Sequence, residues 1–297
     1  FNTGGGLSQI GNTVIVTDRL VATAGTATAG GIRLLNHNRV GTVSLDASGN
    51  DIRFRNTGNI AINAINSPTG TVELISNIGK ITQQSSGGLV AGSLILNAFN
   101  GVELYNSNNQ IARLDVVSRG LVSIHTGGSG FGGLLTVDRI DAAGQTVSVN
   151  NYTWGIAGGN ITAATLSAFS VADMDLSTTN SVTGNVSLSG RNIAFTNLGN
   201  LVIDRVLSPS GNAVLRSEEG AISQTGSALV DTVGLTAYGR DGVTLAGAIK
   251  RIDGLSAGPG ADVEIVTDRA LEVAGDIIAR TVLLRSNMAP NVFTPTG

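Results

Sequence analysis

Apolar and polar residues alternate in short runs along the chain. Each run places two apolar residues two positions apart, as in the pairs Val43 and Leu45, Ile52 and Phe54, Ile60 and Ile62, Val72 and Leu74, Leu94 and Leu96, and Val102 and Leu104. A period of two predicts a β-strand with one face directed inward. Gly, Asn, Ser and Thr fill the segments between the runs, and these residues favour tight turns. Because apolar residues at helical spacing occur only in short stretches broken by Gly, the sequence predicts an all-β fold.

The chain contains a long internal repeat. Residues 51–83 align without gaps to residues 192–224, an offset of 141 positions, and 14 of these 33 positions are identical. Downstream, NGVEL at 100–104 matches DGVTL at 241–245; upstream, GTVSL at 41–45 matches GNVSL at 184–188 after a two-residue slip. We therefore predict a single domain over residues 1–297, in which residues 41–140 resemble residues 184–280.

Short, evenly spaced strands are compatible with a sandwich, an up-and-down barrel or a β-helix. The tandem repeat favours the β-helix, as do Asn residues at the expected turns, where stacked coils form side-chain ladders. Small residues such as Ala22 and Ala24 suit a narrow interior. We expect a right-handed parallel β-helix, or β-solenoid, with coils of about 20 residues, since parallel crossovers are right-handed. Stacked about 4.8 Å apart, such coils would form a rod on the order of 70 Å long.

Composition and charge narrow the functional classes. The 297 residues include 41 Gly and only 13% charged residues, and the net charge is −3. The sequence has no basic patch of the kind that binds nucleic acid, and no apolar run of the roughly 20 residues that a membrane helix needs. The absence of Cys excludes disulfides, thiol catalysis and Cys-ligated zinc. The opening FNTGGGLSQI lacks signal-peptide features, so we interpret the chain as a segment from the interior of a longer one.

Several motifs resemble a known family. GKITQ at 79–83, GGLVAGSLILNAFNGVEL at 87–104 and the GNI, GTV and GAISQ motifs are similar to the coil repeats of large secreted bacterial exoproteins of the filamentous haemagglutinin type. The resemblance covers most of the chain and rests on composition and rhythm, without a catalytic or secretion motif. It implies a right-handed parallel β-helix, export through an outer-membrane partner, an extracellular or cell-surface location, and a role as an adhesin or surface fibre.

Asp173 and Asp175 are the first candidates for chemistry. They flank Met174 in the segment VADMDLS, so both carboxylates would face outward from a strand. A Ca²⁺ site or the acid pair of a polysaccharide-cleaving enzyme needs such an arrangement. An ordinary solvated strand face is the favoured interpretation, because strands routinely expose alternating polar residues. We therefore predict no catalytic, cofactor-binding or metal-binding residues, and no enzyme activity.

Surface contacts are expected at two other places. The Gly-rich segment at 127–133, which includes Gly127 and Phe131, lacks the Lys of a phosphate-binding loop and is interpreted as an excursion from the helix that contacts a partner. Tyr152 and Trp154 form an aromatic pair with polar flanks, and their rings would either stack on sugars or, in the favoured interpretation, fill a widened coil. Four Asp-Arg pairs, at 18–19, 138–139, 204–205 and 268–269, are expected at coil corners, with each Arg stacking on the next coil.

The sequence thus predicts a structural and adhesive β-solenoid segment of a secreted, surface-displayed bacterial fibre or adhesin. The expected partners are other copies of the chain, end to end or laterally, because no capping helix is expected to cover the strand edges of the first and last coils. A host-cell or matrix surface, including its glycans, is the other expected partner; nucleic acid and membrane insertion are not expected. The alternative is a polysaccharide-binding or polysaccharide-cleaving β-helix.

Overall fold

The computed structural model describes residues 2–3, 5–25, 30–127 and 133–287, and within these ranges it contains strands but no helix. In chain order the strands are β1 (Asn2–Thr3), β2 (Leu7–Ser8), β3 (Val16–Ala24), β4 (Ile32–Asp46), β5 (Ile52–Asn56), β6 (Ile60–Ser76), β7 (Ile81–Ala98), β8 (Val102–Leu104), β9 (Gln110–Ser118), β10 (Val122–Thr126), β11 (Leu135–Asn151), β12 (Ile156–Gly158), β13 (Ile161–Ser170), β14 (Met174–Val182), β15 (Asn185–Ser189), β16 (Ile193–Asn197), β17 (Leu201–Ser217), β18 (Ile222–Gly239), β19 (Val243–Ala257), β20 (Asp262–Thr267), β21 (Glu272–Val273), β22 (Ile277–Ile278) and β23 (Thr281–Ser286).

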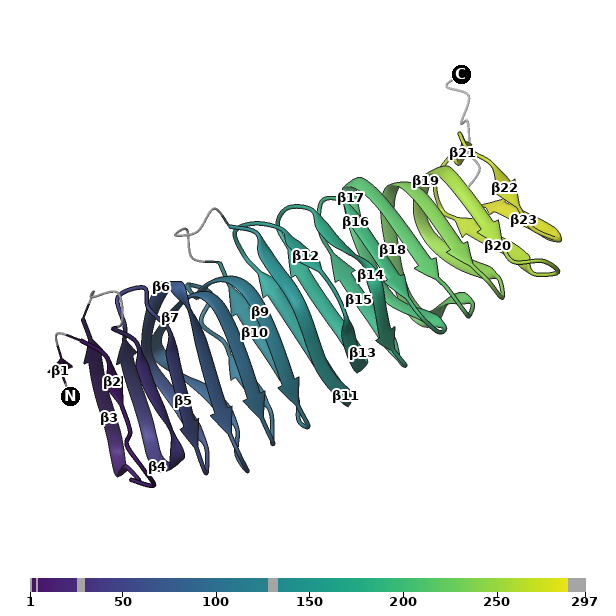
Figure 1. The fold of residues 1–297 in the computed structure, drawn as a ribbon. Coiled ribbons are helices and arrows are strands. Elements are labelled where there is room, and N and C mark those ends of the chain that lie inside the picture. The colour runs from purple at the N-terminus through teal and green to yellow at the C-terminus, as the bar shows by residue number, and fades with distance from the viewer. Residues whose placement is uncertain (1, 4, 26–29, 128–132, 288–297) are drawn as a thin grey trace, which may run out of the picture.

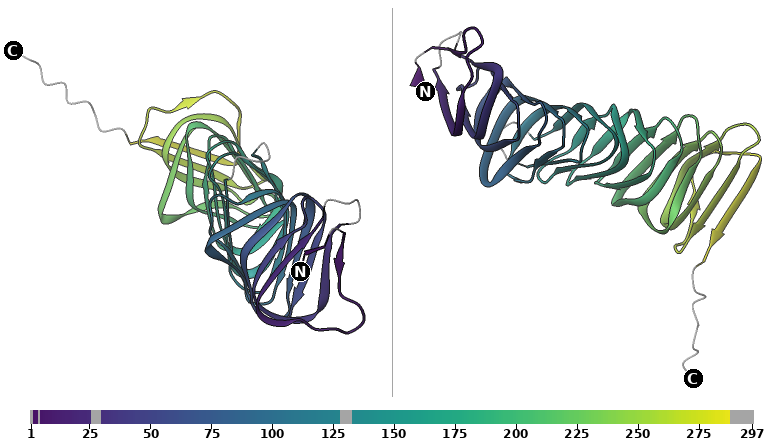
Figure 2. Two further views of the ribbon diagram at one scale, coloured as in Figure 1. Left: turned by 90° about the vertical axis from the view of Figure 1, so that its left-hand side faces the viewer. Right: turned by 90° about the horizontal axis from the view of Figure 1, so that it is seen from below.

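These strands wind into an elongated solenoid, with the first and last strands at opposite ends (Figures 1 and 2). The strand pairs are parallel and join segments about one coil apart. Phe54 pairs with Leu74, and Leu74 with Leu96, at separations of 20 and 22 residues. The structure has about 13 turns spaced roughly 20 residues apart, which confirms the predicted all-β, parallel β-solenoid. At about 4.8 Å per turn, these coils stack to a length of about 60 Å.

Burial alternates along the strands as the apolar pattern predicts. Strand β5 buries Ile52, Phe54 and Asn56 and leaves Arg53 and Arg55 partly exposed. The buried apolar residues form one continuous core along the rod, and Phe54 and Phe195 are its largest fully buried side chains. Each coil therefore covers its apolar face mainly against the coils directly before and after it.

Buried asparagines complete the backbone hydrogen bonding inside this core. Asn56 Oδ1 accepts a hydrogen bond from the Val40 N–H at 2.9 Å, and Asn56 Nδ2 donates to the carbonyl oxygens of Val40 and Asn59 at 2.9 and 2.7 Å. The other buried asparagines are Asn38, Asn109, Asn151, Asn180 and Asn197. Asn38 is in register with Asn56, and Asn180 with Asn197, so these side chains form ladder steps between coils. Backbone groups left unpaired at these positions would destabilise the fold.

Residues that are identical in the two repeat copies make the same contacts. Asn197, the counterpart of Asn56, bonds both backbone groups of Val182 at 2.8 and 2.9 Å and the Asn200 carbonyl at 2.8 Å. Ser76 Oγ donates to the Gly58 carbonyl, and Ser217 Oγ to the Gly199 carbonyl, each at 2.8 Å. Seven strand pairings lead from β5 to its counterpart β16, through β6, β7, β9, β11, β13 and β14. The repeated positions are therefore those that hold the coils together.

Candidate functional site

Asp173 is part of a link between two coils. It lies directly before β14, and its carboxylate accepts hydrogen bonds from Arg191 Nε and Nη2 at 2.8 and 2.9 Å and from Asn192 Nδ2 at 2.9 Å. The Arg191 hydrogen bonds are the largest influence on this carboxyl, and its pKa falls to about 2. Asp173 is therefore ionised at neutral pH and does not serve there as a general acid.

Asp175 lies in β14 and is exposed, as expected for an outward strand position. Its Oδ1 accepts a hydrogen bond from the Ser177 backbone N–H at 3.1 Å. The two aspartates thus differ in their environment, because Asp173 is held by an arginine of the next coil and Asp175 bonds its own strand. No group of three or more metal-ligating His, Cys, Asp or Glu side chains occurs in the described part of the chain.

Gly127 is packed tightly between coils. A Cβ at this position would lie 2.6 Å from the Ser107 carbonyl oxygen and 3.1 Å from Tyr152 Cβ, so a larger residue would collide with the backbone of the neighbouring coil. The Thr153 hydroxyl donates a hydrogen bond to the Gly127 carbonyl. Close approach between coils explains why glycine occupies this position. Phe131, the other residue expected to contact a partner here, lies outside the described residues.

Tyr152 belongs to a row of rings that crosses four coils. Tyr105 contacts His125 with ring centroids 5.4 Å apart, His125 contacts Tyr152 at 5.5 Å, and Tyr152 contacts Phe169 at 5.5 Å. Tyr105 and Tyr152 are 52% and 44% exposed, so the row lies on the surface and does not fill the interior. Burial lowers the pKa of His125, which favours a neutral imidazole between the two tyrosine rings.

Trp154 lies beside this row on the surface. Its side chain is 46% exposed, and a Cβ added to Gly133 would overlap the indole ring, so the ring lies directly over the Gly133 backbone. Its backbone N–H donates to Oδ1 of the buried Asn151 at 3.2 Å. Of the two roles considered for Tyr152 and Trp154, filling a widened coil is excluded by their exposure, and surface contact remains a prediction.

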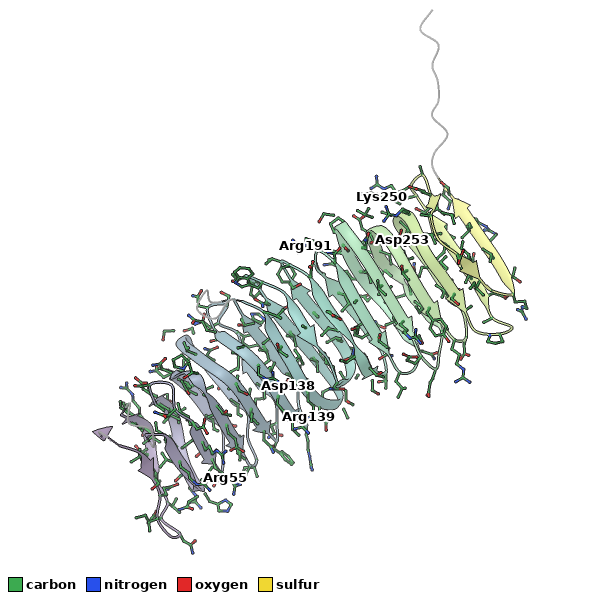
Figure 3. All side chains as sticks on the ribbon, turned by 45° about the horizontal axis from the view of Figure 1, so that its top comes forward. Arg55, Asp138, Arg139, Arg191, Lys250 and Asp253 are labelled. Atoms are coloured by element: carbon green, nitrogen blue, oxygen red, sulfur yellow. The ribbon has the colours of Figure 1, made fainter. Side chains whose placement is uncertain are left out.

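Ion pairs connect neighbouring coils along the outside of the rod, where Figure 3 labels their members Asp138, Arg139 and Arg191. Arg113 binds Asp138 at 2.5 Å, and Arg139 binds Asp115 at 2.9 Å. Two ion pairs of opposite direction therefore link the same two neighbouring coils. Arg139 therefore reaches the preceding coil, whereas each Arg of the Asp-Arg pairs was expected to stack on the next coil. Arg269 differs, because its Nε lies 3.7 Å from Asp268 of the same pair.

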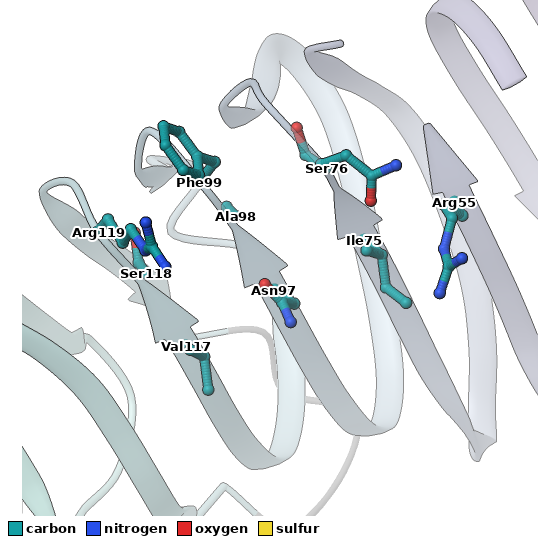
Figure 4. Close-up of a pocket in the computed structure, with 10 residues that line it drawn as sticks. Arg55, Ile75, Ser76, Asn97, Ala98, Phe99, Val117, Ser118 and Arg119 are labelled. Carbon is teal, nitrogen blue, oxygen red and sulfur yellow. The ribbon is translucent and has the colours of Figure 1, made fainter. Parts of the chain in front are cut away.

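A groove of about 410 Å³, which no sequence pattern predicted, lies on the side of the N-terminal coils (Figure 4). Arg55 of β5 and Arg119, which follows β9, line it together with Asn77, Asn97 and Phe99. Arg55 is in register with Ile75, Ile75 with Asn97, and Asn97 with Val117, so the groove crosses three coil steps. The groove combines two cations, two amides and one aromatic ring, a set suited to a polar, anionic ligand.

The row and the groove could be found only partly from sequence. Tyr105 and His125 are 20 residues apart, one coil, and this spacing was available as a signal. Tyr152 follows His125 by 27 residues, and His125 is in register with Asn150, so this coil is longer than 20 residues. The groove forms where outward-facing residues of different coils lie on the same side of the rod. Identifying those residues requires the pairing register of the strands, which the sequence does not give.

Comparisons with models of protein families, with curated proteins and with solved structures found no match. In the described residues, no helix is long and apolar enough to cross a membrane. The fold and the surface features therefore carry the functional argument alone.

Proposed function

We propose that this chain is a structural and adhesive segment of a secreted, surface-displayed bacterial fibre or adhesin. The observation that carries the proposal is the continuous parallel ladder of coils. Backbone pairing, one unbroken core and inter-coil ion pairs such as Arg191–Asp173 join each coil to the next. Such a rod resists bending and holds surface groups at fixed positions along its axis.

Adhesion and self-assembly form the second part of the proposal. The aromatic row and Trp154 offer exposed rings that suit stacking on the sugars of a host-cell or matrix surface. Strand β23 pairs with β20, and no second pairing of β23 is found among the described residues. Such a strand edge pairs with a further strand, either of a following segment or of another copy, and end-to-end assembly of copies is part of the proposal.

Negative-stain electron microscopy over a range of protein concentrations tests this proposal. Fibres one rod wide that lengthen with concentration would support end-to-end assembly, and discrete rods of about 60 Å would support a non-assembling segment. Compact particles without a long axis would contradict the structural role. Surface localisation is tested separately, by antibody labelling of intact bacteria that produce the protein.

A polysaccharide-cleaving β-helix is the second candidate, because two exposed carboxylates lie two residues apart, with Asp173 directly before β14 and Asp175 within it. The lowered pKa of Asp173 and its pairing with Arg191 argue against an acid–base role for this residue. Incubation with acidic polysaccharides, followed by an assay for new reducing ends, separates the two candidates. Activity that is lost in Asp173→Asn or Asp175→Asn would favour the enzyme, whereas no new reducing ends would favour the adhesive rod.

A further inference from the structure

We propose that the groove between Arg55 and Arg119 binds an acidic polysaccharide through its carboxylate groups. This inference rests on the proposed function, because it names the class of ligand that the adhesive rod would hold. The groove residues that would contact the ligand are Arg55, Asn77, Asn97, Phe99 and Arg119.

Both arginines lack an anionic partner in the described part of the chain, and Arg119 contacts only the ring of Phe99. Neither side chain makes an ion pair or a hydrogen bond in the part of the chain that the structure describes, although nine other Arg or Lys side chains there make ion pairs. Arg55 Nε is moreover buried without a hydrogen-bond acceptor, and it is the single buried side-chain atom of this kind among the described residues. A buried cationic donor without an acceptor is destabilising, and a ligand oxygen would satisfy it.

The corresponding place in the second repeat copy contains an acidic residue that the first copy lacks. Residues 141 positions later replace Arg55 with Thr196, Ile75 with Arg216, and Asn77 with Glu218. There Arg216 Nε binds Glu218 at 2.7 Å, and the Arg216 guanidinium lies 4.6 Å from the centre of the Tyr238 ring. The second copy thus neutralises Arg216 internally, whereas Arg240, the counterpart of Phe99, makes no ion pair within the described structure. In the first copy the residue that replaces the glutamate is Asn77, and the positive charge stays available.

The position and length of the groove favour a polymer. Residues 1–120 contain eight Lys or Arg and six Asp or Glu, whereas residues 121–297 contain ten and fifteen, so the groove lies in the more positive part of the chain. No acidic residue lines it. The strands that carry Arg55 and Val117 are three coil steps apart, about 14 Å, a span that suits an extended ligand better than a single sugar.

The side chains between the two arginines favour a glycan. Asn97 provides an amide for hydroxyl groups, and Asn77, whose Nδ2 bonds His37 Nδ1 at 3.1 Å, provides its amide oxygen. Phe99, which is 43% exposed and lies 5.1 Å from the Arg119 guanidinium, provides a ring for a sugar face. Guanidinium groups bind planar carboxylates in a bidentate manner, which points to a uronic-acid polymer.

Binding of polygalacturonate to the full chain, measured by isothermal titration calorimetry at low salt, tests the inference. We expect Arg55→Gln and Arg119→Gln each to weaken binding by about tenfold or more. Asn77→Glu should weaken it similarly by supplying the internal carboxylate of the second copy, whereas Asn77→Gln should have a smaller effect. Arg240→Gln is the matched control, because it removes an exposed arginine of the second copy with the same change in charge.

Further ligands separate the possible sources of the signal. Galacturonate monomer should compete poorly, dextran should not bind, and dextran sulfate tests whether any polyanion suffices. The inference is overturned if polygalacturonate does not bind, if Arg240→Gln weakens binding as much as Arg55→Gln, or if dextran or dextran sulfate binds as tightly as polygalacturonate. A negative binding result would not change the elongated particles that we expect in electron microscopy. It is therefore distinguishable from a failure of the proposed structural role.

Discussion

Replacing Asn197 with alanine should destabilise the coils around β14 and β16 strongly. The Asn197 side chain is completely buried and pairs with the Val182 N–H, the Val182 carbonyl and the Asn200 carbonyl. Alanine would leave all three backbone groups without these partners. At the low end of the penalty for a buried unsatisfied group, about 1 kcal/mol each, the free energy of unfolding should fall by about 3 kcal/mol. Asn56→Ala should cost a similar amount, because Asn56 makes the corresponding bonds.

Urea denaturation followed by circular dichroism measures the overall loss, and hydrogen exchange measures it locally. Because solenoids unfold in neighbouring units, exchange of the Val182 amide should accelerate in Asn197→Ala while coils near Asn56 keep their protection. Asn108→Ala is the control, since the Asn108 side chain is exposed and makes no hydrogen bond within the described structure. The reasoning is refuted if Asn197→Ala destabilises the protein no more than Asn108→Ala, or if Val182 keeps its protection.

Three further predictions follow from the core, from the inter-coil ion pairs and from the aromatic row. Phe195→Ala should lower the free energy of unfolding by about 3–5 kcal/mol in urea titrations, whereas Leu121→Ala, at an exposed position, should cost much less; equal losses would contradict the packing argument. Asp173→Asn should cost less than about 1 kcal/mol at pH 7, because the pair with Arg191 is exposed to solvent. The folded-state pKa of Asp173, about 2, lies below the ordinary value near 3.9, so this stabilisation is present above about pH 4 and disappears as the pH falls through 2. Thermal melts from pH 1.5 to 7 should show that fading difference, and a constant difference would disprove the assignment. Tyr152→Ala should raise the pKa of His125 by exposing the imidazole to water, which an NMR titration of the ring protons measures; an unchanged pKa would show that Tyr152 does not shield the ring.

The fold was accessible from sequence because its determinants are local and repeated. Alternating pairs such as Ile52 and Phe54 specify strands with one buried face, and the 141-residue offset requires units that contact their neighbours. The hand of the coil stays a prediction. Adhesion, secretion and the absence of enzyme activity also stay predictions, because they concern molecules other than this chain.

The surface was less accessible because it depends on register. The outward position of Asp173 was expected, but its partner Arg191 lies 18 residues away, on the neighbouring coil. The link between Arg113 and Asp138 spans 25 residues, because coil length varies along the chain. The sequence identifies which side chains point outward, but the coil lengths decide which of them meet.

The agreement between Asn56 and Asn197, together with the contrast between Asn77 and Glu218, has a consequence for building longer proteins. Each seven-coil unit behaves as a cassette whose inward positions set the winding and whose outward positions can be rewritten without changing it. Inserting another unit at the repeat boundary would lengthen the protein by about 34 Å and keep its register. A charge pattern designed on one unit could then be repeated at that interval, so that chosen surface groups would recur at a fixed spacing along the rod.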